Sequence, residues 1–236
     1  NCLLDTLRHK NGVFNEFVNE GLDITDLWLK EIIDSMKEAG VFEHTNFVMV
    51  SDHGQMNFVR RIKPNVLFVR NGFIKLSKDG TIADWRAYAQ SNGMSASVFV
   101  KDKRDEQEVY DYLKKLANDG VWGFETCYTK KEVNEKFGWS GDFSFVLETD
   151  GFTTFSEDWH EPITNPMDLS DYRLGKATHG YEPTKGPQPI FVATGPAFKK
   201  DVSIPFCHVI DEAPTFAQIL GQDMPQAEGR VLSELI

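Results

Sequence analysis

The fold of this chain is decided at Asn46-Phe47-Val48-Met49-Val50-Ser51-Asp52-His53-Gly54. The run from Phe47 to Ser51 is largely apolar and rich in β-branched and aromatic residues, which predicts a strand buried on both faces of a parallel sheet. Asp52 and His53 follow where this strand ends, and Gly54 allows a sharp turn. In open α/β sheets, ligands bind just outside the carboxyl ends of the strands, so the pair is predicted to lie at a functional edge. A carboxylate beside an imidazole suits zinc or manganese, although a turn capped by Asp52 explains the same residues.

The segments before this stretch predict a strand, helix, strand unit. Leu3 and Leu4 indicate a strand end, and a polar loop follows that contains Asp5 and His9. Apolar residues then recur at helical spacing between residues 22 and 39, before a glycine that suits a helix C-terminus. A crossover of this length is what a parallel pair of strands requires. Each predicted strand therefore ends near one Asp and one His.

The character of the sequence changes between residues 73 and 172. A short apolar run occupies 65–70. We expect strands at 96–100 and 143–147 and helices at 105–116 and 130–137, and then a strand at 188–194 and a helix at 211–220. The predicted division is a metal-binding α/β core formed by 1–72 and 173–236, with residues 73–172 inserted as a smaller α+β subdomain. The predicted fold class is α/β, with a mainly parallel sheet flanked by helices.

Composition and charge exclude several classes of protein. The net charge of −11, from 36 acidic and 25 basic residues, argues against a nucleic-acid polymer as ligand. No apolar run approaches the roughly 20 residues of a membrane span. The three cysteines are far apart and form no Cys-x-x-Cys motif, which argues against a disulfide framework or a thiolate metal site and favours a reducing, cytoplasmic setting.

Three short motifs in order resemble a known family. They are Asp5-x-x-x-His9, then Asp52-His53-Gly54, then Thr178-His179-Gly180-Tyr181. Together they resemble the type I phosphodiesterase and nucleotide pyrophosphatase branch of the alkaline phosphatase superfamily. The match covers the C-terminal half to two-thirds of such an enzyme.

The resemblance implies an alkaline phosphatase-like fold and hydrolysis of phosphodiester or pyrophosphate bonds in a small phosphate-ester substrate. It also implies two divalent metal ions, zinc or manganese, about 4 Å apart, which clamp the attacking and leaving oxygens. Asp5, His9 and His179 match the ligands of one ion. Asp52 and His53 match two ligands of the other.

The resemblance also implies parts that this sequence lacks. The second ion of such enzymes takes a further Asp and a Thr or Ser nucleophile, and both lie upstream of the Asp-x-x-x-His motif. Counting ligands gives the same expectation, because Asp52 and His53 alone leave a metal underligated. We therefore expect the chain to be a fragment, with no catalytic nucleophile of its own and inactive alone.

Three alternative functions are compatible with the same motifs. Another branch of the superfamily, such as a phosphonoacetate hydrolase or a manganese-dependent phosphomutase, would differ in metal and in the bond that it cleaves. A non-catalytic domain would keep the fold and an ion without turnover. A purely structural domain without metal is the third alternative, and the sequence does not identify the substrate.

Overall fold

The computed structural model describes residues 2–167 and 175–236, which form two compact units. The first unit joins the chain up to Leu22 with Gly54–Gln188, and the second joins Asp23–His53 with Pro189–Ile236. The division predicted from the sequence is drawn elsewhere, after residues 72 and 172. Its second boundary lies outside the described residues, so that division stays a prediction.

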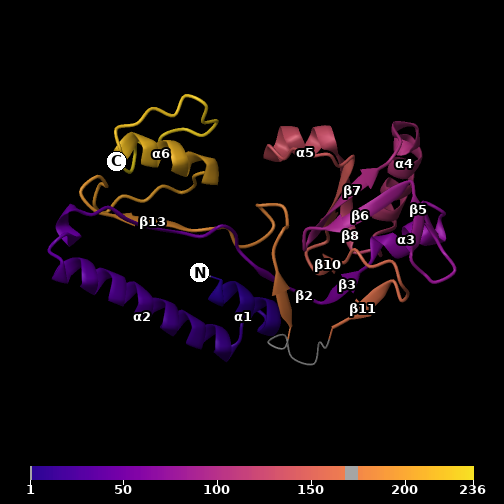
Figure 1. Ribbon diagram of the computed structural model, residues 1–236, viewed down its shortest axis with the longest axis horizontal. Helices are drawn as coiled ribbons and strands as arrows, with labels where there is room; N and C mark the ends of the chain where they lie inside the picture. The colour runs from indigo at the N-terminus through magenta and orange to yellow at the C-terminus, as the bar shows by residue number, and fades with distance from the viewer. Residues whose placement is uncertain (1, 168–174) are drawn as a thin grey trace. The chain divides into compact units, whose positions relative to one another are not determined.

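A four-stranded antiparallel sheet forms the centre of the first unit (Figure 1). In sheet order its strands are β6 (Ala87–Ser91), β7 (Ser95–Val100), β9 (Phe145–Thr149) and β8 (Phe124–Thr129). A 3-10 turn, η2 (Lys103–Asp105), leads into helix α4 (Glu106–Asp119), and helix α5 (Lys130–Phe137) follows β8. These elements confirm the strand predicted at 96–100 and both predicted helices, and β9 begins two residues later than predicted.

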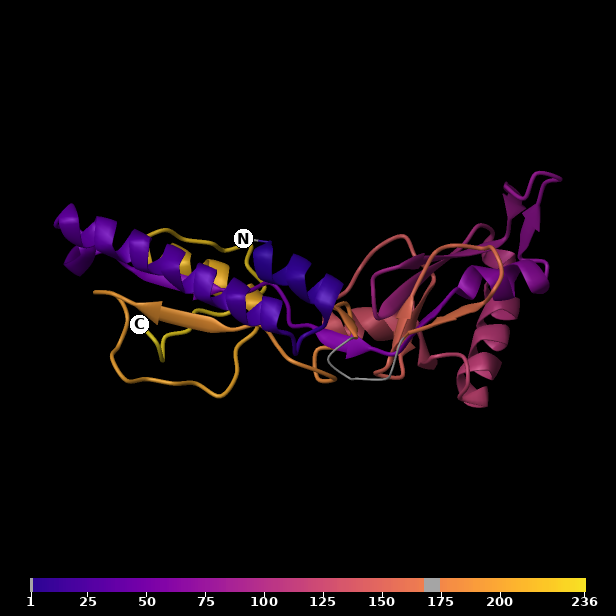
Figure 2. The same cartoon turned by 90° about the horizontal axis from the view of Figure 1, so that it is seen from below.

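The two faces of this sheet have different helical partners, because successive side chains of a strand point to opposite faces. Phe145 and Leu147 of β9 pack in the large core with Val109 and Leu113 of α4, whereas Val146 packs with Val133 of α5. Figure 2 shows α4 and the sheet from below. The sheet is therefore covered on both faces, and its two-residue alternation decides which helix each side chain meets.

The short apolar run at 65–70 forms a helix, α3 (Pro64–Arg70). Pro64 occupies the first turn, where its missing N–H costs nothing, and Lys63 before it is extended. The apolar residues of the run, Val66, Leu67 and Phe68, are buried in this helix. A hairpin of β4 (Ile74–Leu76) and β5 (Ile82–Trp85) follows.

Smaller sheets complete the first unit. β3 (Arg60–Ile62) lies between β10 (Thr153–Phe155), to which it is parallel, and β11 (Thr164–Pro166), to which it is antiparallel.

β2 (Met56–Phe58) pairs antiparallel with β12 (Lys176–Thr178), and helix α1 (Leu3–Asn11) packs against β12. The strand predicted at Leu3 and Leu4 and the loop after it are therefore wrong. Leu4 and Leu7 lie one turn apart on α1 and contact the chain at Gly21, where a Cβ would lie 2.5 Å from Leu7.

The second unit contains the stretch on which the sequence prediction rests. Helix α2 (Glu16–Glu38) begins in the first unit, six residues before the predicted start, and is followed by a 3-10 turn, η1 (Phe42–His44). Strand β1 (Phe47–Val50) pairs with β13 (Phe191–Thr194), and the chain ends with η4 (Val209–Asp211) and α6 (Glu212–Ile219).

The predicted strand at 47–51 is confirmed, but its predicted partner and burial are not. β1 and β13 run antiparallel, with Phe47 opposite Thr194, and β1 is half-buried with Val50 exposed. Among the described strands, parallel pairing occurs between β3 and β10. Within residues 2–167 and 175–236, none of the helices combines the length and apolar character that a bilayer crossing requires.

Candidate metal centre

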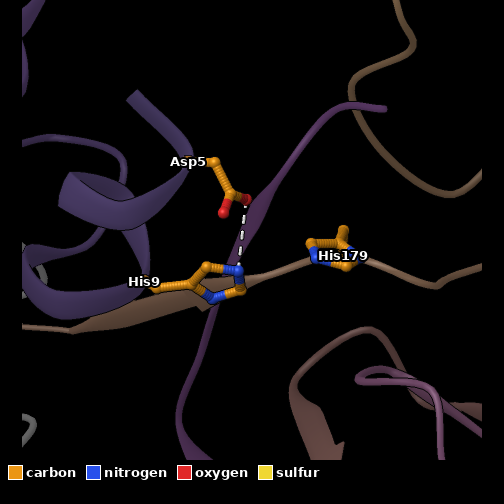
Figure 3. A group of neighbouring side chains, drawn as sticks. All are labelled: Asp5, His9 and His179. Carbon is orange, nitrogen blue, oxygen red and sulfur yellow. Dashed lines mark ion pairs between the residues drawn. The ribbon is translucent and has the colours of Figure 1, made fainter. Parts of the chain in front are cut away.

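Helix α1 places Asp5 and His9 one turn apart on the same face. Residues four apart on a helix lie above one another, so the Asp-x-x-x-His spacing brings the two side chains together. Oδ1 of Asp5 lies 3.2 Å from Nε2 of His9, and both side chains are about one-third exposed (Figure 3). This arrangement depends on helix α1, at a place where the sequence predicted a loop.

His179 joins this pair from the residue directly after β12. Its ring centroid lies 5.2 Å from that of His9, with the two planes at 65°. The potential ligand atoms of Asp5, His9 and His179 all lie within 4.8 Å of one another. Figure 3 shows the three side chains near one another: Asp5 and His9 come from the helix, and His179 comes from the end of the strand. The structure thus brings together the three residues that the sequence predicts for one metal.

The second nitrogen of His9 has a fixed role. Nδ1 lies 2.8 Å from the carbonyl oxygen of Ala177 on β12. Since a carbonyl oxygen only accepts hydrogen bonds, Nδ1 carries the proton, and a neutral ring presents the Nε2 lone pair to Asp5. Nε2 of His9 and Oδ1 of Asp5, 3.2 Å apart, are two donor atoms between which a divalent cation could be held.

A buried amide orients the carboxylate of Asp5. Nε2 of Gln55 donates a hydrogen bond of 2.8 Å to Oδ1 of Asp5, and Gln55 is only 5% exposed. Groups of this kind around a metal fix the direction of its ligands. Gln55 could not be predicted from the sequence, because a single Gln after a glycine turn carries no pattern that points to a metal.

The geometry of these residues fits a divalent ion. Two ligands of one tetrahedral zinc, with bonds of about 2.0–2.2 Å, lie about 3.3 Å apart. Oδ1 of Asp5 and Nε2 of His9 have nearly this separation already. The ligand atom of His179 lies within 4.8 Å of the other two, so small shifts of the side chains would bring all three to bonding distance of one ion. Three protein ligands leave one position open for substrate or water, as in catalytic zinc sites. The mixed oxygen and nitrogen set also accepts manganese.

Asp52 and His53 belong to the second unit. Asp52 is 87% exposed, and its Oδ2 lies 3.4 Å from Nε2 of His53. The backbone N–H of His53 donates to Oδ1 of Asp52 at 3.1 Å. These contacts join Asp52 and His53 to each other. That the two residues ligate a second metal ion stays a prediction.

The fold and the motifs together place the chain in the alkaline phosphatase-like class of α/β proteins. Residues 3–182 match the model of the type I phosphodiesterase / nucleotide pyrophosphatase family. The matched region covers most of the chain and contains all five predicted ligands. The chain belongs to the type I phosphodiesterase / nucleotide pyrophosphatase family.

Similar proteins agree with this assignment. Over 221 residues, 86% of the chain, it is 24% identical to ectonucleotide pyrophosphatase/phosphodiesterase 1 of Saccharomyces cerevisiae, and it covers 28% of that protein. Its structure resembles murine ectonucleotide pyrophosphatase / phosphodiesterase 5, with a TM-score of 0.71 and 21% identity. For the human counterpart the TM-score is 0.68 and the identity 20%. Each structural match covers 98% of this chain and 56% of the other. The predicted family and the predicted α/β fold are confirmed. The predicted mainly parallel sheet is wrong for the described strands, because β3 and β10 pair in parallel and the other described pairs are antiparallel.

Proposed function

We propose that the chain binds a divalent metal ion at Asp5, His9 and His179, and that this centre serves the hydrolysis of phosphodiester or pyrophosphate bonds. One observation carries the proposal: three side chains from two distant segments place their ligand atoms within 4.8 Å of one another. The family membership supplies the reaction class. Because the chain spans 28% and 56% of the relatives that it matches, the activity of the whole protein belongs to this proposal.

Each residue of the centre has a separate part in the proposal. Asp5 supplies an anionic oxygen, and His9 supplies Nε2 because Ala177 holds its other nitrogen. His179 completes the set from the end of β12. A bound divalent ion would polarise a phosphoryl oxygen and neutralise its negative charge. That neutralisation matters here, because a chain with a net charge of −11 repels phosphates at a distance.

We propose a nucleotide-type phosphate ester as the substrate and zinc as the metal. Murine ectonucleotide pyrophosphatase / phosphodiesterase 5 has a solved structure as an inactive variant in complex with AMP, which supports a nucleotide for this chain. The second ion belongs to the same proposal, with Asp52 and His53 as two of its ligands. Manganese is the alternative metal.

The proposal is tested by metal binding and hydrolysis measured on the same protein. Zinc and manganese are titrated calorimetrically into the metal-free protein and into the Asp5→Ala, His9→Ala and His179→Ala variants, with His44→Ala as the control. His44 has the same chemistry but is exposed in the other unit. We expect each ligand variant to lose at least about tenfold in affinity, and the control to lose none. Equal affinity in all four variants would contradict the proposed centre.

Hydrolysis separates the proposed reaction from the alternatives. A nucleotide phosphodiester, a phosphomonoester and a phosphonate are each assayed with the metal-loaded full-length protein that contains this chain, and again after chelation, because the chain alone is expected to lack the nucleophile. We expect cleavage of the diester, and its loss on chelation and in His179→Ala. Cleavage of the phosphonate would favour the other branch of the superfamily. Tight metal binding without turnover of any substrate would favour the non-catalytic domain.

A further inference from the structure

The backbone at His179 is held by the turn between β6 and β7. The backbone N–H of Met94 donates a hydrogen bond of 2.9 Å to the carbonyl oxygen of His179. The two residues are far apart in sequence, and the turn lies in the segment predicted as an insertion. A ligand residue of the candidate metal centre is thus tied to the four-stranded sheet.

Two glycines allow the backbones to approach this closely. A Cβ on Gly93 would lie 2.3 Å from the carbonyl oxygen of His179, and a Cβ on Gly180 would lie 1.9 Å from the carbonyl oxygen of Asn92. Both contacts are with backbone atoms, which cannot rotate away as a flexible side chain can. Any side chain at either position therefore displaces the chain at His179.

The turn is itself anchored to strands of two sheets, β10 and β9. The carbonyl oxygen of Gly93 accepts hydrogen bonds from the Thr154 hydroxyl at 2.9 Å and from the Phe155 N–H at 2.8 Å. The carbonyl oxygen of Met94 accepts from the Thr149 N–H at 3.1 Å, and the side chain of Met94 is fully buried. A turn with so many fixed groups holds its neighbour in one place.

We propose that the turn Asn92–Met94 is a positioning element for His179, and that the closeness of His179 to Asp5 and His9 depends on it. The inference rests on the proposed function, because it assigns His179 a position that a metal ion uses. The turn contributes no ligand. Its role is to set the backbone from which the His179 ring reaches the cluster.

The test compares two glycines with the same backbone strain. Gly93 has φ +93° and Gly151 has φ +91°, yet a Cβ on Gly151 would meet nothing within 4 Å. Alanine at either position is strained by its positive φ, and only Gly93→Ala also pushes on His179. Zinc affinity and melting temperature are measured for the wild type, Gly93→Ala and Gly151→Ala.

We expect both variants to melt at reduced temperatures, and Gly93→Ala at the lower one because its Cβ also meets the His179 backbone. Gly93→Ala should lose about 10- to 100-fold in zinc affinity, as when other supports of metal ligands are removed, and Gly151→Ala should stay within about twofold of the wild type. Unchanged affinity in Gly93→Ala would overturn the inference. So would an equal loss in both variants, because lower stability alone would then explain it.

A measurement without metal separates this inference from the proposed function. The ring protons of His9 and His179 are close enough for a nuclear Overhauser effect, since their centroids lie 5.2 Å apart. We expect this signal in the metal-free wild type and in Gly151→Ala, and its loss in Gly93→Ala. If the wild type bound no zinc, the proposed function would fail and this signal alone would decide the positioning role. A signal that persists in Gly93→Ala would overturn that role.

Discussion

The Nδ1 atom of His9 lies 2.8 Å from the carbonyl oxygen of Ala177, so helix α1 and strand β12 are joined by a side chain of the candidate metal centre. Ala177 is two residues before His179. The strand that delivers one imidazole therefore also fixes the ring orientation of the other. His9 and His179 are therefore coupled through β12. Because Asp5 lies on the same helix as His9, the cluster keeps its geometry if α1 and β12 move together.

This contact predicts the tautomer of His9. We expect the neutral ring of His9 to carry its proton on Nδ1 both in the metal-free protein and in the zinc-loaded protein. The reason is that the Ala177 carbonyl oxygen can only accept a hydrogen bond from this nitrogen. Long-range nitrogen–proton NMR correlations of labelled histidine distinguish the two ring nitrogens. An Nε2–H form in the zinc-loaded protein would show that His9 does not ligate as proposed.

Gln55→Met tests the support of Asp5. The methionine has a similar length but no N–H to donate, so Oδ1 of Asp5 loses the 2.8 Å hydrogen bond. We expect zinc affinity to fall about tenfold. Gln90→Met, an exposed position on β6, is the control. Calorimetric zinc titration of both variants makes the comparison, and equal affinities would remove Gln55 from the centre.

Asp158→Asn tests an ion pair away from the metal centre. Oδ2 of Asp158 lies 2.7 Å from Nζ of Lys63, which is 9% exposed and would lose its charged partner. Hydrogen bonds to charged groups contribute about 1.5–3 kcal/mol, and the 40% exposure of Asp158 favours the lower part of that range. We expect the free energy of unfolding to fall by about 1–2 kcal/mol, measured by urea denaturation. Asp142→Asn, an exposed position, should change little.

The same ion pair has a predicted pH dependence. The hydrogen bond from Lys63 lowers the pKa of Asp158, and a further bond from His160 acts in the same direction. A carboxyl whose folded pKa is depressed contributes stability above its unfolded pKa of about 3.9, and loses that contribution as the pH falls through the folded pKa. The stability difference between wild type and Asp158→Asn should therefore be constant above about pH 5 and shrink below pH 4. A difference that grows on acidification would contradict this assignment.

The sequence predicted the ligand set better than the local structure around it. The motifs at Asp5, His9 and His179 led to three residues that the structure brings together. The helix that carries two of them was missed, because Leu3 and Leu4 alone resemble a strand end. Leu7 continues the helical spacing, and this was the signal that could have corrected it. At residues 64–70, Pro64 was the corresponding helix signal.

The supports of the centre could not have been predicted from the sequence. Gln55 reaches Asp5 across 50 residues, and Met94 reaches His179 across a still longer separation. Asn92-Gly93 is recognisable as a hairpin turn signal. Nothing in its local pattern indicates which distant backbone it touches. Contacts of this kind depend on how whole elements pack, which periodicity and turn chemistry do not encode.

The most direct test is diffraction from zinc-soaked crystals at the zinc absorption edge. We expect an anomalous peak about 2.0–2.2 Å from a carboxylate oxygen of Asp5, from Nε2 of His9 and from a ring nitrogen of His179. Nδ1 of His9 should remain on the Ala177 carbonyl in the same crystals. Fully loaded crystals with no peak among these three side chains, or with zinc bound only elsewhere, would contradict the proposed centre.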